Sequence, residues 1–262
     1  MKIAFIGMGN MAQAIAAGFV QSKKIAAADI FAYAPNQKKL KENAACIGFV
    51  SCQSNREAAE KGDMVFMACK PYQIEGVLSE LSAALEGKAL VSIAAGWTFD
   101  SYAKILDTSK TRVLCVMPNT PLRAGQGVTL FEEKNSLFGE ELKFAKEIFS
   151  SLGLVETIPA SLMGIGGAVS GCGPAFMDLI IESYADAAVK YGMQRAQAYR
   201  LVSQTMLGSA ALQLATGEHP GVLKDAVCSP GGTTIRGVAA LEKAGREERI
   251  EMRSFERQGI EL

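Results

Sequence analysis

The sequence predicts an α/β N-terminal domain with a mostly parallel sheet, followed by an all-α C-terminal domain. Three observations on the 262-residue chain lead to this fold class. Short apolar runs alternate with helix-periodic segments up to about residue 158, strand signals stop after Pro159, and a glycine-rich turn follows the first apolar run. We therefore expect one domain over residues 1–158 and a second over residues 159–262.

The first domain is predicted to alternate strands with helices. The strand-like runs are Ile3–Ile6, Ile30–Tyr33, Met64–Cys69, Leu90–Ala94, Val113–Met117, Val128–Phe131 and a closing Leu154–Ile158. The helical patterns between them include Asn36–Ile47, Tyr72–Leu85, Phe99–Leu106 and Asn135–Ser150. Because nearly continuous apolar strands are typical of sheets buried on both faces, we expect a parallel sheet covered by helices on either side.

The second domain is predicted to be helical over Ala175–Tyr191, Ala196–Thr216, Thr233–Ala244 and Glu247–Arg257. The uncharged stretch 157–177 resembles a membrane span in composition, but Pro159, Pro174 and five glycines interrupt it. We therefore expect loops and helix ends there. Since a helical half so rich in small apolar residues can hardly close a core alone, the predicted partner is a second copy of the chain, giving a homodimer.

Charge and cysteine usage exclude several classes of partner. The 27 basic residues balance the 27 acidic ones, so there is no electrostatic case for nucleic acid or an anionic membrane. The six cysteines form no C-x-x-C pair and no cluster with His219, the single histidine. We therefore expect neither a metal site nor a disulfide framework, and a reduced cytoplasmic setting.

The N-terminus carries a dinucleotide fingerprint. Residues 1–12 contain a short strand, the turn G-x-G-x-x-A and the start of an alanine-rich helix that continues to about Val20. In this pattern Gly7 makes the tight turn, Gly9 admits a pyrophosphate and Ala12 packs the helix on the strand. The alternative is a secretory signal, but the turn ends the apolar run after four residues. A Rossmann-like nucleotide domain is therefore predicted.

The end of the second predicted strand indicates which coenzyme is bound. NAD-binding folds place a carboxylate there, on the ribose hydroxyls, and this chain has no Asp or Glu in Phe31–Lys39. Asn36, Lys38 or Lys39 could bind a 2′-phosphate instead, so NADP(H) is predicted over NAD(H). The two lysines have a second interpretation as a solvated helix face. Lys70, after the next strand, is a candidate acid, although the following proline favours a cofactor-lining role.

A second anion site is predicted near the C-terminal end. Ser229–Gly232 interrupts one helical pattern, and Thr233 starts another. The first turn of a helix offers backbone N–H groups and the positive end of the helix dipole, both of which favour an anion. The glycines allow close approach, and the hydroxyls of Thr233 and Thr234 add donors. A simple N-cap is the alternative interpretation of the threonines.

In this order, these segments resemble the pyrroline-5-carboxylate reductases over essentially the whole chain. The matching segments are Phe5–Ala12, Cys69–Pro71, Ala94–Gly96, Met117–Pro121, Ser170–Ala175, His219–Gly221 and Leu223–Glu242. The last is specific to the family, whereas many dehydrogenases share the first. The resemblance implies NAD(P)H-dependent reduction of 1-pyrroline-5-carboxylate, a cyclic imine carboxylate, to L-proline, the final step of proline biosynthesis. Hydride would pass from nicotinamide C4 to the imine carbon, C5 in proline numbering.

The resemblance also implies roles for individual residues. The substrate carboxylate would be held by Ser229, Gly231, Gly232, Thr233 and Thr234, with Thr234 near the ring nitrogen as the catalytic residue. The implied contacts to NADP(H), or to NAD(H) as a second coenzyme, are Ile6, Gly7, Met8, Gly9, Asn10, Met11, Ala34, Asn36, Asn55, Ala68, Cys69, Lys70, Pro71, Ala94 and Ala95.

The chain departs from the family pattern before its first long C-terminal helix. Pro159–Ser161 stands where relatives often have an acidic pair, Cys172 where serine is usual, and Gly166–Gly167 where Val-Thr is typical. No acidic substrate contact is therefore predicted from that segment. Glu218 remains a further candidate for polarising a water near the imine.

Two other functions fit parts of the pattern. A hydroxyacid or 6-phosphogluconate-type dehydrogenase needs a lysine base on a long helix, and Ala175–Tyr191 has only Lys190 near its end. A non-catalytic NADP-binding regulator would bind the coenzyme without turnover, and the intact anion loop disfavours it.

Overall fold

The computed structural model describes residues 1–247 and divides the chain into two compact units, Met1–Pro174 and Ala175–Leu262. The boundary lies later than the one expected after residue 158. The physical reason is that the intervening residues pack on the sheet. Met163 and Ala168 are buried, and a Cβ on Gly166 would lie 2.7 Å from the side chain of Leu130. The two units are described separately.

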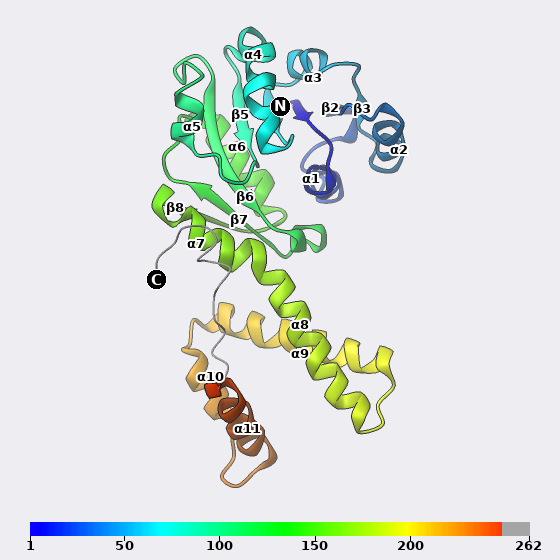
Figure 1. Cartoon of the computed structure of the whole chain (residues 1–262), viewed down its shortest axis with the longest axis vertical. Coiled ribbons are helices and arrows are strands. Elements are labelled where there is room, and N and C mark those ends of the chain that lie inside the picture. Colours follow the sequence, from blue (N-terminus) through cyan, green and yellow to red (C-terminus); the bar gives the residue numbers. More distant parts are fainter. Residues whose placement is uncertain (248–262) are drawn as a thin grey trace. The chain divides into compact units, whose positions relative to one another are not determined.

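The first unit alternates strands and helices as predicted (Figure 1). Its strands are β1 (Ile3–Ile6), β2 (Ile30–Tyr33), β3 (Val50–Ser51), β4 (Met64–Met67), β5 (Ala89–Ser92), β6 (Arg112–Pro118), β7 (Gly127–Glu132) and β8 (Gly153–Ile158). Its α-helices are α1 (Asn10–Gln21), α2 (Gln37–Ile47), α3 (Asn55–Lys61), α4 (Ile74–Leu85), α5 (Phe99–Ala103), α6 (Gly139–Ser150) and α7 (Met163–Gly166). Short 3₁₀ turns are η1 (Ala27–Asp29), η2 (Pro71–Gln73), η3 (Thr120–Ala124) and η4 (Ala160–Leu162).

All eight strands form one sheet in the order β3-β2-β1-β4-β5-β6-β7-β8. Every pairing is parallel except that of β6 with β7, so the predicted mostly parallel sheet is confirmed. The strand order reverses direction at β1, which pairs with both β2 and β4. In open parallel sheets, ligands bind outside the carboxyl ends of the strands at this switch point.

Helices cover both faces of the sheet, as expected. One core contains side chains of α1, α2 and α6, and the other contains side chains of α3, α4 and α5. The first core includes a cluster of phenylalanines, in which the rings of Phe5 and Phe66 lie 4.8 Å apart and Phe19 meets Phe149 edge-on at 5.6 Å. Edge-on and tilted ring pairs of this kind add to the stability that burial provides. Because both faces of the sheet are packed in this way, the loops that leave its strands start from fixed positions.

Two of the strands that border the switch point end earlier than predicted. β4 ends at Met67 rather than Cys69, and β5 ends at Ser92 rather than Ala94. The apolar residues that follow them leave the sheet and form loops, so their backbone groups become available at the carboxyl edge. The two-residue β3 and the seven-residue α3 were not predicted from the sequence.

The expectation of loops between residues 157 and 177 is wrong. After η4, one continuous helix extends to Lys190, with a π-helical segment at Gly167–Cys172 between α7 and α8 (Gly173–Lys190). The glycines do not break this helix, because they let it approach the sheet: a Cβ on Gly167 would overlap Met117. Pro174 is the second residue of α8 and follows directly on the π-helical segment, where the helix changes its hydrogen-bonding pattern.

The second unit is helical, as predicted, and contains most of α8 with α9 (Arg195–Thr216), α10 (Pro220–Ala226) and α11 (Thr233–Glu247). Within its described residues, only Ala185, Ala198 and Val202 are buried hydrophobics, while Tyr191 is 86% and Leu214 76% exposed. The unit therefore presents much apolar surface. The predicted helix Glu247–Arg257 lies outside the described residues beyond Glu247.

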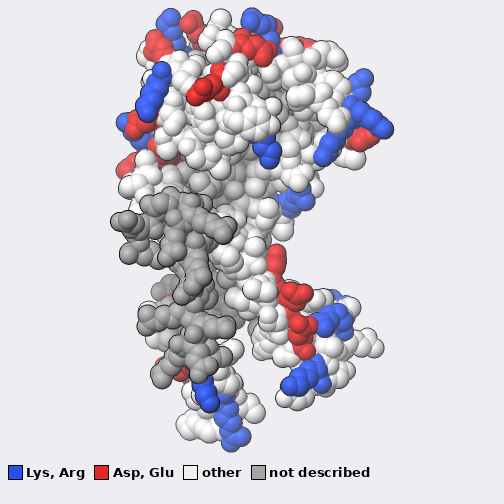
Figure 2. All heavy atoms as spheres, in the orientation of Figure 1, with Lys and Arg blue, Asp and Glu red and all other residues white. Residues whose placement is uncertain are grey.

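Charged side chains of both signs intermingle over the face shown in Figure 2. Several form exposed ion pairs, such as Lys134 with Asp100 and Lys110 with Glu86. Exposed pairs of this kind contribute little to stability. The mixture agrees with the zero net charge of the chain.

Candidate functional site

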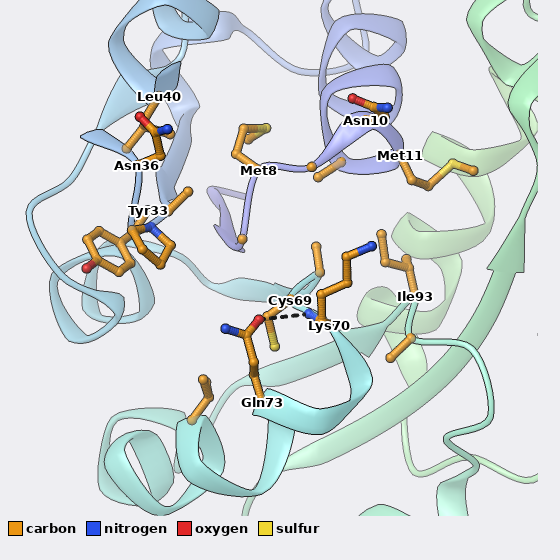
Figure 3. A pocket seen from close by; sticks show the side chains of 18 of the residues that line it. Met8, Asn10, Met11, Tyr33, Asn36, Leu40, Cys69, Lys70, Gln73 and Ile93 are labelled. Atoms are coloured by element: carbon orange, nitrogen blue, oxygen red, sulfur yellow. Dashed lines mark hydrogen bonds between the residues drawn. The ribbon is translucent and has the colours of Figure 1, made fainter. Parts of the chain in front are cut away.

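A cavity of about 660 Å³ opens at the carboxyl ends of β1, β2, β4 and β5. It lies in the first unit, at the switch point of the sheet, and Figure 3 shows its lining from close by. Tyr33, Asn36 and Leu40 lie on one side, and Asn10, Met11 and Ile93 lie on the other. The volume is that of a site for a large organic ligand.

Two glycines in the turn after β1 have different structural roles. Gly7 has φ of +96°, and a Cβ there would lie 2.7 Å from the carbonyl oxygen of Ala68. Gly9 has φ of −75°, and a Cβ there would meet nothing within 4 Å. Gly7 therefore permits the turn and the contact with the next strand loop, while Gly9 leaves open space in the cavity. α1 begins directly afterwards, so its first N–H groups and its positive dipole end border that space.

The side of the cavity next to β2 is polar. Asn36 is the N-cap of α2, where its Oδ1 accepts a hydrogen bond of 3.0 Å from the N–H of Lys39. Lys39 and Asn43 line the cavity from the same helix. Lys38, which is exposed, is not among the described residues that line this cavity. The structure thus distinguishes the two lysines, which the sequence offered equally as candidates for binding a 2′-phosphate.

The opposite side is formed by the loops after β4 and β5. The N–H of Lys70 donates a 3.2 Å hydrogen bond to Oε1 of Gln73, which holds the turn into η2 (Figure 3). Cys69 lines the cavity beside them, and burial raises the pKa of its thiol. The thiol therefore stays protonated at neutral pH and behaves as a small apolar wall rather than as a nucleophile.

Nearly all of the predicted cofactor residues line this single cavity, although they come from five separate segments of the chain. They are Gly7, Met8, Gly9, Asn10, Met11, Ala34, Asn36, Asn55, Ala68, Cys69, Lys70, Pro71, Ala94 and Ala95. Ile6 does not line it. Its side chain is 1% exposed and packs in the core, because it belongs to the buried strand β1.

Several residues that line the cavity were not predicted from the sequence. Tyr33, Gln73, Val77 and Ile93 also line the cavity. Tyr33 and Ile93 could have been found, because each lies at the carboxyl end of a predicted strand next to the switch point. Gln73, in the 3₁₀ turn η2, and Val77, in α4, had no such signal, since they face the cavity only because of how these two elements pack.

The predicted carboxylate-binding residues lie in the second unit, in the loop after α10 and in the first turn of α11. Gly231 has φ of +68°, and the N–H of Gly232 donates a 3.0 Å hydrogen bond to the carbonyl of Ser229, which closes a turn. A Cβ on Gly232 would overlap the Ser229 hydroxyl. α11 begins at Thr233, and the side chains of Thr233 and Thr234 are exposed. The helix start is therefore formed as predicted.

His219 has a local structural role. It is the N-cap of α10, and its Nδ1 accepts a 3.1 Å hydrogen bond from the N–H of Gly221. Among residues 1–247, no three His, Cys, Asp or Glu side chains gather closely enough to hold a metal ion.

The cavity has the features that a dinucleotide requires. The open space at Gly9 lies against the first turn of α1, where a pyrophosphate would be bound by backbone N–H groups. The polar side chains of α2 lie where an adenosine ribose with a 2′-phosphate would bind, and the loops after β4 and β5 lie beyond the switch point, on the nicotinamide side. The residues present therefore fit NADP(H).

Comparison with known proteins agrees with this geometry. Residues 2–96 match the family model described as NADP oxidoreductase, coenzyme F420-dependent, and residues 160–254 match that for pyrroline-5-carboxylate reductase dimerisation. The chain is 41% identical to the pyrroline-5-carboxylate reductase of Escherichia coli, over 93% of this chain and 91% of that protein. The corresponding protein of Treponema pallidum is 38% identical, with 94% of each chain covered.

A solved structure gives the same result. The pyrroline carboxylate reductase of Plasmodium falciparum, with NADP bound, superimposes with a TM-score of 0.85 and 32% identity, over 98% of this chain and 95% of that one. The likeness extends over both units. The chain belongs to the pyrroline-5-carboxylate reductase family.

Proposed function

We propose that this protein reduces 1-pyrroline-5-carboxylate to L-proline with NADPH. The observation that carries the proposal is the near-full-length similarity to reductases of that name, of which the chain covers 94% and 91%. The cavity at the start of α1 supplies the site that such a reaction needs for its coenzyme. Neither a hydroxyacid dehydrogenase nor a non-catalytic regulator is favoured by a particular observation, and α8 contains no lysine before Lys190.

The coenzyme site is proposed to be the cavity of the first unit. The backbone at Gly7–Met11 would bind the pyrophosphate, and Asn36 with Lys39 would bind the 2′-phosphate of NADP(H). Lys39 supports this assignment because it is the cavity-lining lysine of α2. With no carboxylate at the end of β2, nothing there repels the phosphate, so NADPH should be preferred to NADH.

The substrate carboxylate is proposed to bind at the start of α11, with Ser229, Gly231, Gly232 and Thr233 around it. The turn at Gly231–Gly232 leads directly into the first turn of α11, and the dipole of this 15-residue helix favours an anion there. Thr234 would place its hydroxyl near the ring nitrogen, which makes it the candidate catalytic residue.

The reaction needs little from acidic or basic side chains. NADPH, when bound, would supply the hydride and leave as NADP⁺. When the imine nitrogen is protonated, hydride addition to its carbon forms a C–H bond, and the π electron pair of the C=N bond moves to nitrogen to give the amine. The chain must therefore bind and orient two reactants and exclude water, which can account for a large part of a catalytic barrier.

The second unit is proposed to form a homodimer in the cytoplasm. Its exposed apolar side chains and the dimerisation model that matches residues 160–254 support this proposal. One helix, Ala160–Lys190, is long and apolar enough to cross a membrane by length and composition alone. The same residues fall within the dimerisation match, so a covered subunit interface accounts for their apolar character.

The proposal is tested by following NADPH oxidation with synthetic pyrroline-5-carboxylate and identifying proline as the product. We expect turnover with NADPH and a higher KM for NADH. Binding of NADP⁺ by calorimetry without turnover of the imine would overturn the proposed reaction, and a lower KM for NADH would overturn the proposed coenzyme.

A further inference from the structure

The cavity wall at Ile93–Ala95 owes its shape to its backbone. These residues follow β5 and line the cavity on its nicotinamide side. Two of the three are alanines, whose side chains are too short to fix the wall by their own packing. Something behind the wall must therefore hold the main chain in place.

The groups that hold it are buried hydroxyls. Ser92, the last residue of β5, is 1% exposed, and its Oγ accepts a hydrogen bond of 3.2 Å from the N–H of Ala94. The same Oγ accepts a shorter bond of 2.7 Å from the hydroxyl of Tyr102, which is fully buried. The carbonyl of Ala94 accepts a bond from the N–H of Trp97. Both backbone groups of Ala94 are therefore fixed.

Tyr102 is itself held by the elements around it. It lies on α5, whose first turn is capped by Thr98. The N–H of Phe99, at the start of the same helix, donates a 2.8 Å bond to the buried carboxylate of Glu132 on β7. The ring of Trp97 packs 5.0 Å from that of Tyr102. Hydrogen bonds thus link β7 to α5, α5 to β5, and β5 to the cavity wall.

We propose that Ser92 and Tyr102 are positioning residues, which hold the Ala94–Ala95 wall in the conformation that binds the nicotinamide half of the coenzyme. The inference rests on the coenzyme site proposed above. Neither hydroxyl lines the cavity, so both act through the backbone of Ala94. Removing the Tyr102 hydroxyl frees the Ser92 side chain to turn away from the Ala94 N–H, and removing the Ser92 hydroxyl leaves that N–H without its acceptor.

The test compares Tyr102→Phe, Ser92→Ala and the double variant in the full chain. The Kd for NADP⁺ is measured by calorimetry and by the emission of Trp97, which is the single tryptophan of the chain and is bonded to Ala94. Each single variant should raise the Kd about three- to tenfold, the effect of one hydrogen bond. The Kd of the double variant should equal that of the single variant with the higher Kd, because both changes remove the same support of the Ala94 N–H.

Steady-state kinetics add a second measurement. The KM for NADPH should rise, while the KM for the imine at saturating NADPH stays within about twofold of wild type, a separation that general loss of folding would not produce. Tyr191→Phe and Ser79→Ala serve as matched controls, since Tyr191 lies on the second unit and Ser79 bonds only to its own helix α4.

Two results would overturn the inference. One is a Kd for NADP⁺ within about twofold of wild type in both single variants, whether or not the melting temperature falls. The other is additive effects in the double variant. Because the Kd is measured without substrate, wild-type protein that binds NADP⁺ but does not reduce the imine would refute the proposed function alone.

Discussion

Gly9→Ala should remove coenzyme binding without weakening the fold. Gly9 has φ of −75° and ψ of −178°, a conformation that alanine adopts freely, and an added Cβ would meet no protein atom within 4 Å. Gly-to-Ala changes in such a conformation stabilise proteins by about 0.4–1 kcal/mol, because they restrict the unfolded chain, but alanine is a poorer N-cap than glycine, so the two effects should roughly cancel at Gly9. The same methyl group would occupy the space where the pyrophosphate approaches the backbone. We expect the Kd for NADP⁺ to rise at least about tenfold, or about 1.4 kcal/mol.

Gly7→Ala is the matched contrast, two residues away in the same turn. Its φ of +96° is a strained conformation for alanine, and the new Cβ would lie 2.7 Å from the carbonyl oxygen of Ala68 and 2.8 Å from the amide nitrogen of Cys69. Strain of about 1–3 kcal/mol and overpacking of a similar size give a loss of about 2–6 kcal/mol. For a unit of this size, the melting temperature should fall by about 4–24 °C.

Thermal unfolding and calorimetric titration with NADP⁺ separate the two effects. Gly9→Ala should unfold close to the wild-type temperature but bind the coenzyme weakly, whereas Gly7→Ala should unfold at a clearly lower temperature. Wild-type affinity in Gly9→Ala would refute the assignment of the open space to the pyrophosphate. A wild-type melting temperature in Gly7→Ala would show that the turn is not held by its packing against the loop after β4.

Three further predictions concern single side chains. Lys39→Met should raise the KM for NADPH about three- to tenfold and leave the KM for NADH unchanged, because the lost charge would face only the 2′-phosphate. Thr234→Ala should lower turnover about tenfold and leave the Kd for NADP⁺ unchanged, since the hydroxyl would contact the substrate alone. Glu132→Gln should raise the melting temperature at pH 8 by an amount that shrinks on acidification. Burial raises the pKa of Glu132 from its ordinary value near 4.5, so stability is lost as the pH rises through the folded-state pKa.

Each of these variants has its own check. Lys38→Met is the control for Lys39, because it removes the same charge from the same helix at a residue that does not line the cavity. An equal rise in the KM for NADPH in Lys38→Met would refute the role of Lys39. Thr205→Ala, on α9, is the control for Thr234, and equal losses of turnover and coenzyme affinity in Thr234→Ala would indicate a folding role instead. For Glu132, a stability difference that does not change with pH would show that the buried charge is not its cause.

The order and type of the large elements could be predicted from the sequence. Strands such as Ile3–Ile6 and Ile30–Tyr33 match the prediction at both ends. Their apolar runs are continuous because both faces of the sheet are covered, and that signal is local. The short elements β3 and α3 gave no such signal, since two strand residues or seven helical residues are fewer than the roughly four or eleven over which each apolar pattern can be recognised.

Local composition gave a wrong prediction for residues 157–177, where packing against the sheet determines the secondary structure. The glycines between residues 157 and 177 predicted loops, yet the structure contains a helix there. Glycine disfavours helix in isolation, but at Gly166 and Gly167 it permits a close approach to Leu130 and Met117 that a side chain would prevent. This packing against the sheet depends on residues far away in the chain, so the local composition does not reveal it.

By itself, the sequence determined the glycine turn at Gly7 and Gly9, the helix start at Thr233 and the alternation that builds a parallel sheet. Each of these is specified by neighbouring residues, through backbone freedom or a short repeat. Only the tertiary structure decided that Lys39 rather than Lys38 lines the cavity, and that Glu132 and Tyr102 support the wall at Ala94. Those assignments depend on strand register and helix packing, which bring together residues 10 to 33 positions apart. No local sequence pattern predicts such contacts.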